Sequence, residues 1–443
     1  MSKYPRLIML AAIVVASADS AFAQGYGGPS MLSRGGNRPG QRGTAPVELV
    51  VYGGLRGVME TGLTPVRLEA DDTLASDTLY SAQAEIGAYG THSWSKTILG
   101  LDYRGDYRKS TRHTLRGYDG TNQALSLDLE YRPTRRLMVM FRETAGTSNR
   151  AFGGFSAPAY SNLNSLGLAN NEVFDTRVYF SQTSAMVSYM TSARTSWTAG
   201  GDGFVVKRPD RALVGLTGYR AMGMWNYRLN RSSTIGAAYT YMRLNYPRAF
   251  AGADMHGIAL QGNKRMTRNL QLDVTAGAFI VDTFGLRTIT LSPEVAALLG
   301  RGTGIEAFQV TTWVPQVETT VRYALERSTF SLTGTIGTNP GNGVYLTSRQ
   351  DSVSAGYSLS GTRKLSLGLS ASYSRLKSVG ATIGNLNSSR AGGGINYAIT
   401  RLVNFSSQID WRTYNSPGLR GREGFMLAIG LTVSPARVPL SIW

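Results

Sequence analysis

The sequence has 443 residues, with 52 Gly, 23 Tyr and no Cys, and only 17% of the residues are charged. The lack of Cys excludes disulfides and thiolate metal sites, and the composition suits strands and turns better than helices. The formal net charge of +18 would suit a nucleic-acid partner, but the positions of the basic residues, described below, indicate a different role.

The first 23 residues predict a secretory signal. Lys3 and Arg6 form its charged region, and Ala21-Phe22-Ala23 forms its cleavage site. Residues 24–46 are rich in Gly, Pro and Arg, so we expect a flexible periplasmic tail. No later segment approaches the roughly 18 to 20 apolar residues of a membrane-spanning helix, so a chain in a membrane would have to cross it with strands.

Residues 47–433 predict a transmembrane antiparallel β-barrel. Segments of about ten residues alternate between apolar and polar side chains, which is typical of a sheet with one wet face. In 124–131, for example, Leu125 and Leu127 share one face while Ser126 and Asp128 share the other. The segments pair into eight hairpins: 80–90 with 94–106, 122–132 with 136–146, 180–190 with 195–206, 213–228 with 232–245, 254–265 with 270–281, 316–325 with 328–338, 350–360 with 364–376, and 389–399 with 402–414.

A single strand precedes the hairpins near 47–59, and another follows near 421–433, which gives 18 strands, with 16 as the alternative count. Residues 434–443 form a separate C-terminal segment. The connections within the hairpins are short, whereas those between hairpins are long and polar. Outer-membrane barrels place the short turns in the periplasm, so both termini are expected to be periplasmic.

The basic residues concentrate in the short turns, where we find one acid, Glu326. A basic rim at one end of a barrel would meet anionic lipid headgroups. This placement argues against a nucleic-acid partner. The residues are Arg132, Arg135, Arg136, Arg194, Arg228, Arg231, Lys264, Arg265, Arg268, Arg327, Arg363, Lys364 and Arg401.

A tyrosine recurs just before the short turns. Its apolar ring and polar hydroxyl suit the boundary of the hydrocarbon layer, so we interpret these residues as an aromatic girdle. The alternative is that tyrosine simply favours strands, although that preference would not repeat the spacing to the turn. The residues are Tyr131, Tyr189, Tyr227, Tyr323, Tyr357 and Tyr397.

Charged residues on the polar face of the alternating strands are the candidate pore lining. They would either line a wet channel or pair across strands to satisfy a closed interior; an 18-stranded barrel is too wide for side chains alone to fill. The residues are Glu85, Asp102, Arg104, Asp106, Asp128, Glu130, Arg142, Arg220, Asp273, Glu318, Arg322, Asp410 and Arg412.

Two long connections could narrow such a pore, residues 147–172 and 282–315. The second contains Ser292-Pro293-Glu294 and then an apolar run that ends at Gly300, which predicts a short capped helix. Each connection would either fold inward as a constriction or remain at the outer surface as a lid or loop.

No catalytic or metal-binding motif stands out. The three histidines, His92, His113 and His256, have no partner that the local sequence identifies. We therefore expect neither an enzyme nor a cofactor or metal.

The cleavage site Ala21-Phe22-Ala23, repeated units such as LEYRPTRRLMVMF and INYAITRLVNFSSQ, and the terminal aromatic Trp443 together resemble bacterial outer-membrane β-barrels of the porin type. The resemblance covers nearly the whole mature length and implies a channel in the outer membrane for passive diffusion of small hydrophilic solutes. The alternative is an export barrel, for a polymer such as an exopolysaccharide, or a structural barrel that displays its outer loops. The expected partners are the lipid bilayer and small solutes; a homo-oligomer or a periplasmic export partner is left open.

Overall fold

The computed structural model describes most of the expected barrel. It covers residues 47–62, 78–111, 119–149, 177–209, 213–341, 344, 346–359, 364–379, 384–400, 402–416, 419–434 and 438–440. The predicted signal, the predicted tail and most of the 147–172 connection lie outside these residues. No helix in the described part of the chain is long and apolar enough to cross a membrane.

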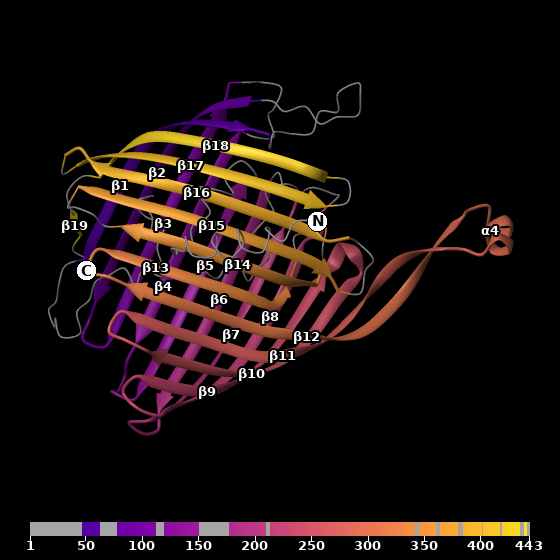
Figure 1. Cartoon of the computed structure of the whole chain (residues 1–443), viewed down its shortest axis with the longest axis horizontal. Coiled ribbons are helices and arrows are strands. Elements are labelled where there is room, and N and C mark those ends of the chain that lie inside the picture. Colours follow the sequence, from indigo (N-terminus) through magenta and orange to yellow (C-terminus); the bar gives the residue numbers. More distant parts are fainter. Residues whose placement is uncertain are drawn as a thin grey trace, which may run out of the picture.

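The described strands form one closed antiparallel sheet in which each strand pairs with its neighbours in the chain and β1 pairs with β18 (Figure 1). The all-β barrel, the 18 strands and the eight hairpins are therefore confirmed. The strands are β1 Val47–Thr61, β2 Thr78–Ser93, β3 Thr97–Ser110, β4 Gly120–Tyr131, β5 Leu137–Asn149, β6 Arg177–Met190, β7 Thr195–Lys207, β8 Leu216–Arg228, β9 Ser233–Tyr246, β10 Ala251–Arg265, β11 Leu270–Thr290, β12 Thr303–Ala324, β13 Ser328–Asn339, β14 Ser348–Leu359, β15 Leu365–Ser378, β16 Leu386–Ala398, β17 Val403–Ser416, β18 Leu419–Val433 and the short β19 Val438–Leu440.

The closing seam continues beyond the expected end of the barrel at residue 433. Gly53 pairs with Val433, and Leu49 pairs with Val438. Three residues of β1 lie between these pairs, against four residues of the C-terminal side, so the register shifts by one residue, as in a β-bulge. Pairing then resumes in β19, and Pro439 is tolerated there because β19 pairs with β1 alone.

Period-two alternation gives the sheet two chemically different faces. On β4, Asn122, Ser126 and Asp128 are buried while Leu125 and Tyr131 are exposed. The exposed large apolar side chains of the other strands share the register of Leu125, and the buried charged ones share the register of Asp128. The apolar face therefore points away from the barrel and the polar face points into it.

Four of the short turns have the same hydrogen-bonding pattern. The Oγ1 atoms of Thr134, Thr267 and Thr400 and the Oγ atom of Ser192 each accept hydrogen bonds from the backbone N–H groups two and three residues ahead. Such side-chain acceptors replace backbone partners in a tight turn. Of the basic residues that follow in these turns, Arg135, Arg136, Arg194 and Arg268 are exposed.

The connection expected at 282–315 is instead a strand extension, so its prediction as a loop is wrong. β11 and β12 pair as far as Thr290 and Thr303, well past the ends of their other neighbours. Figure 1 shows this hairpin projecting away from the barrel, with α4 at its tip. The predicted short helix is confirmed as α4, Pro293–Leu299, which ends at Gly300 with a positive φ of 63°. The hairpin therefore does not fold into the barrel mouth.

Candidate functional site

The inward face of the barrel carries all thirteen charged residues that the sequence predicts as pore lining. Strand register, followed from pair to pair around the barrel, places each of them on the same face as the buried Asp128, opposite the exposed apolar side chains. Their inward position follows from strand register. Contact with a water-filled path stays a prediction.

Three ion pairs form within this predicted set. Asp128 lies directly opposite Arg142 on the neighbouring strand, and the two form a salt bridge. Asp102 and Arg104 pair at 2.9 Å along β3, and Asp410 and Arg412 pair at 2.6 Å along β17. Residues two apart on a strand face the same side, so one strand can carry both partners.

Most of the remaining predicted residues have partners that the sequence did not suggest. Glu85 pairs with Arg56 at 2.9 Å, and Arg220 pairs with Asp202 at 2.6 Å. Glu130 pairs with Arg132 at the rim. Asp106 accepts a hydrogen bond from Asn122 at 2.9 Å, and Asp273 accepts hydrogen bonds from Asn263 and Gln271. Glu318 and Arg322 lie four residues apart on the inward face of β12.

Within the described residues, five further charged side chains lie on the inward face and were not predicted: Arg56, Glu60, Arg108, Asp202 and Arg390. The expected strands ended before Glu60 and Arg108, although alternation continues through both residues. Asp202 and Arg390 lie in glycine-rich stretches, where the polar face has few side chains to reveal the pattern. Arg108 could have been found from its own strand, because Asp102, Arg104 and Asp106 already mark every second position before it.

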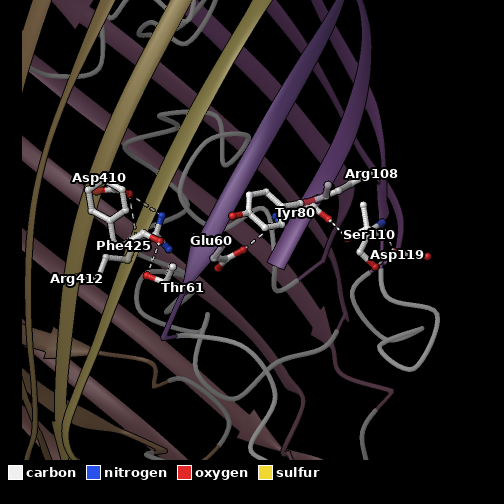
Figure 2. A network of polar contacts seen from close by, with 11 residues as sticks. Glu60, Thr61, Tyr80, Arg108, Ser110, Asp119, Asp410, Arg412 and Phe425 are labelled. Carbon is white, nitrogen blue, oxygen red and sulfur yellow. Dashed lines mark hydrogen bonds and ion pairs between the residues drawn. The ribbon is translucent and has the colours of Figure 1, made fainter. Parts of the chain in front are cut away.

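A polar network occupies the ends of β1 to β3 farthest from the short turns (Figure 2). Arg108 is 1% exposed; its guanidinium pairs with Glu60 at 3.1 Å and donates to Ser81 at 2.7 Å. The backbone N–H and hydroxyl of Ser110 both donate to Asp119 at 2.7 Å. Each buried charge in this network has an opposite partner, as burial requires.

Across several ion pairs the acid is buried while the arginine is half-exposed. The exposed fractions are 36% for Arg390 against 1% for Asp410, and 32% for Arg220 against 6% for Asp202. Arg142 and Asp128 show the same contrast. The formal charge of the inner face is therefore close to balanced, but the charge it presents at the surface comes mainly from guanidinium groups.

Another part of the inner face is apolar. Toward the end opposite the short turns, β6 to β12 contribute a buried cluster that includes Phe180, Phe204, Leu244, Met255 and Phe279. Residues of three connections, Val214, Ala249 and Leu346, pack against this cluster.

The connection between β13 and β14 folds inward to reach this apolar cluster. The hydroxyl of Tyr246, at the end of β9, donates to the carbonyl of Pro340 at 2.7 Å and lies 3.2 Å from Oγ1 of Thr347. The backbone N–H of Val379 donates to Thr347 at 2.9 Å. β9 and β13 are four strands apart, so these groups can meet only through the interior. The sequence had suggested two other connections, and not this one, as constrictions.

The six predicted girdle tyrosines lie on the outward face at the ends of strands that run into short turns. Several join aromatic neighbours across strands: Tyr323 opposes Phe330, Phe330 opposes Tyr357, and Tyr397 opposes Phe405. The basic turn residues within the described part of the chain are exposed at the same end; Arg363 and Arg401 lie outside it. Their contact with lipid stays a prediction.

The two histidines in the described part of the chain each lie beside an aromatic side chain. His92 lies near the end of β2 with its ring centroid 4.2 Å from that of Trp94, and His256 faces outward with Nδ1 2.9 Å from the hydroxyl of Tyr239. His113 lies outside the described residues. No group of three or more histidines or acids that could hold a metal occurs among those residues.

No protein-family model matches the chain, and no curated protein matches it. Among solved structures it is similar to Pseudomonas aeruginosa OccK8 (OprE), with 13% identity, a TM-score of 0.44, and coverage of 88% of this chain and 99% of that one. The outer membrane protein opdK from the same organism gives 11%, 0.44, 87% and 99%. A BenF-like porin from Pseudomonas fluorescens Pf-5 gives 9%, 0.43, 88% and 100%.

At these values the likeness carries no statement about function. The fold assignment rests on the closed pairing of 18 strands and on the opposite chemistry of the two faces. This architecture, a closed antiparallel barrel with an apolar outer face, agrees with the fold that the resemblance noted in the sequence implies.

Proposed function

We propose that the protein is an outer-membrane channel for passive diffusion of small hydrophilic solutes. The observation that carries this proposal is the opposition of an apolar outer face to an ion-paired inner face around a closed sheet. Only closed barrels and helices satisfy every backbone group in hydrocarbon. A polar inner surface of this width is the arrangement that outer-membrane channels use to hold water.

The path for solute runs along the ion-paired wall formed by β1 to β5 and β16 to β18. The opposite wall is partly occupied by the inward-folded connection at Pro340 and Thr347. The half-exposed guanidinium groups of Arg142 and Arg390 then face the solute. Because their acids are buried beside them, they present donors for polar solutes without a large excess of charge.

Planar-bilayer conductance of the purified protein tests the channel. Steady unitary currents without any added protein support passive diffusion. Silence until a periplasmic partner is added would instead support the export barrel, and permanent silence would contradict both. A binding assay with a charged polymer cannot replace this test, because the polymer could bind the rim without crossing the channel.

Orientation has its own test, since the chain has no Cys and single cysteines can be introduced cleanly. Leu298→Cys places a thiol at the tip of α4, where Leu298 is 85% exposed, and Arg268→Cys places one in a short turn. An impermeant maleimide should label Leu298→Cys in intact cells. Arg268→Cys should react only after the outer membrane is permeabilised. The reverse result would place the short turns outside.

A further inference from the structure

The outward face of β5 to β10 is interrupted by a polar row. Strand register aligns Glu143, Thr183, Gly203, Tyr219 and Arg243, and the row continues to Asp254. Its members share the face of exposed apolar side chains such as Phe141, Val187 and Ile258. A charged or hydroxyl side chain that faces hydrocarbon is costly unless it has a polar partner.

The position of the row along the barrel axis is unusual for polar side chains. Thr183 lies six residues along β6 from the girdle tyrosine Tyr189, which is about 15 Å along the barrel axis at a tilt near 40°. On β18 the apolar outward residues run for eight residues from Val433 to Phe425, or about 20 Å by the same arithmetic. The apolar band of such barrels is roughly 25 Å tall, so at Thr183 the row falls within its upper part.

A recess lies at the centre of the row. It has a volume of about 390 Å³ and is lined by outward side chains that include Ser181, Thr183, Thr217, Tyr219 and Asn245. Gly203 forms part of its floor, and a Cβ added there would meet no heavy atom within 4 Å. The recess therefore exists because this position carries no side chain.

Hydrogen-bonding groups of both kinds surround the recess. Glu143 accepts hydrogen bonds from the hydroxyls of Ser181, at 2.9 Å, and Thr183. On the other side, the hydroxyl of Tyr241 donates to Asp254 at 3.0 Å, and Arg243 lies 3.7 Å from the same carboxylate. The rim thus carries acceptors and donors, with carboxylates among them.

We propose that this recess binds the sugar headgroup of a membrane glycolipid. A sugar offers hydroxyls that both donate and accept, which matches the mixed wall better than a bare phosphate would beside Glu143 and Asp254. A second copy of the barrel would present a sheet too broad to fill a recess floored by glycine. Lipid tails would cover the apolar strands below the row, while the headgroup satisfies the polar groups that hydrocarbon cannot.

Two glycine variants test the proposal as a matched pair. Gly203→Leu fills the recess, and Gly223→Leu places the same side chain on the same outward face but outside the recess. A Cβ at Gly223 likewise meets nothing within 4 Å, so both variants should fold equally well. The full-length protein is reconstituted in nanodiscs of phosphatidylethanolamine that contain a small share of a glucosamine-disaccharide glycolipid. Bound lipid is counted by native mass spectrometry after release into mild detergent.

Wild type and Gly223→Leu should retain the glycolipid over phosphatidylethanolamine, and Gly203→Leu should reduce that retention by at least about tenfold, because the leucine overlaps the headgroup. Equal retention by all three proteins would overturn the proposal, as would equal retention of the two lipids by wild type. A wild-type oligomer in light scattering that Gly203→Leu dissociates would overturn it in favour of an interface between copies. The inference depends on membrane insertion but not on conduction, so unchanged unitary conductance in both variants separates its failure from failure of the proposed channel.

Discussion

The two walls of the barrel interior obey the same backbone geometry but hold together in different ways. Along β1 to β5 and β16 to β18, charged side chains pair with neighbours on the same or the next strand. Toward the end opposite the short turns, β6 to β12 instead bury apolar side chains beneath residues of inward-folded connections. An interior position becomes apolar where another segment covers it, and ion-paired where only its own sheet can neutralise it.

The largest expected effect comes from breaking a buried pair on the charged wall. Asp410→Ala removes a buried carboxylate that pairs with Arg412, which is 3% exposed, and with the half-exposed Arg390. Removing one partner of a buried ion pair costs about 3 to 5 kcal/mol. Denaturant unfolding in detergent, followed by tryptophan fluorescence, should show this loss. A loss below about 1 kcal/mol, as for an exposed pair, would mean that the wall is hydrated enough to carry a lone guanidinium.

On the apolar wall, the matching change is one that creates a cavity, and it should also lower the free energy of unfolding. Leu244→Ala truncates a side chain with no exposed surface, and such truncations cost about 2 to 5 kcal/mol, depending on how far the site collapses. The same unfolding measurement applies. An unchanged free energy of unfolding would show that the cluster is loosely packed and that the inward-folded connection does not depend on it for its position.

Tyr246→Phe sharpens the comparison by releasing the connection while keeping the ring. The variant deletes the hydroxyl that donates to Pro340 and lies against Thr347, at a cost of about 1 to 3 kcal/mol for the buried groups left unpaired. We expect more current fluctuation or a larger unitary conductance, because the connection would be held less firmly. An identical current trace would mean that this connection does not limit the path.

The exposed guanidinium groups should affect the ion preference of the channel more than they affect the stability of the barrel. Replacing Arg142 and Arg390 together by Gln keeps hydrogen-bonding capacity but removes the charge that the charged wall presents. The reversal potential in a salt gradient should move toward cations, with a permeability ratio changed on the order of twofold. No shift would place the solute path away from the charged wall.

The smallest effect is expected outside the barrel interior. Arg349 and Asp351 form an ion pair at 2.8 Å with both side chains more than a third exposed. Exposed pairs contribute about 0 to 1 kcal/mol, so Asp351→Ala should leave unfolding nearly unchanged. It is the control for Asp410→Ala, because both changes remove an aspartate that faces arginine.

The sequence alone predicts the sheet well and the interior partly. Alternation in β4 is regular enough to place Asp128 and Glu130 correctly, because every second residue there is apolar. Asp202 and Arg390 lie in the glycine-rich strands β7 and β16. Their inward position was not predicted because glycine has no side chain that would show the alternation between apolar and polar faces. The length of β11 and β12 was also missed: beyond the barrel each strand keeps only one neighbour, and nothing local marks where pairing should stop. The contact of Tyr246 with Pro340 depends on tertiary packing between segments 94 residues apart, which no local pattern encodes.

The seam between the first and last strands has a consequence for biogenesis. Thr61 and Phe425 are 364 residues apart along the chain, yet they meet across this seam. Until the final strand has been synthesised, the edge of β1 that it will cover has no partner strand and could pair with strands of other chains. The cylinder therefore cannot close before the whole chain has been made. The short return of β19 onto Val47–Leu49 then acts as a latch that engages only when the whole polypeptide is present.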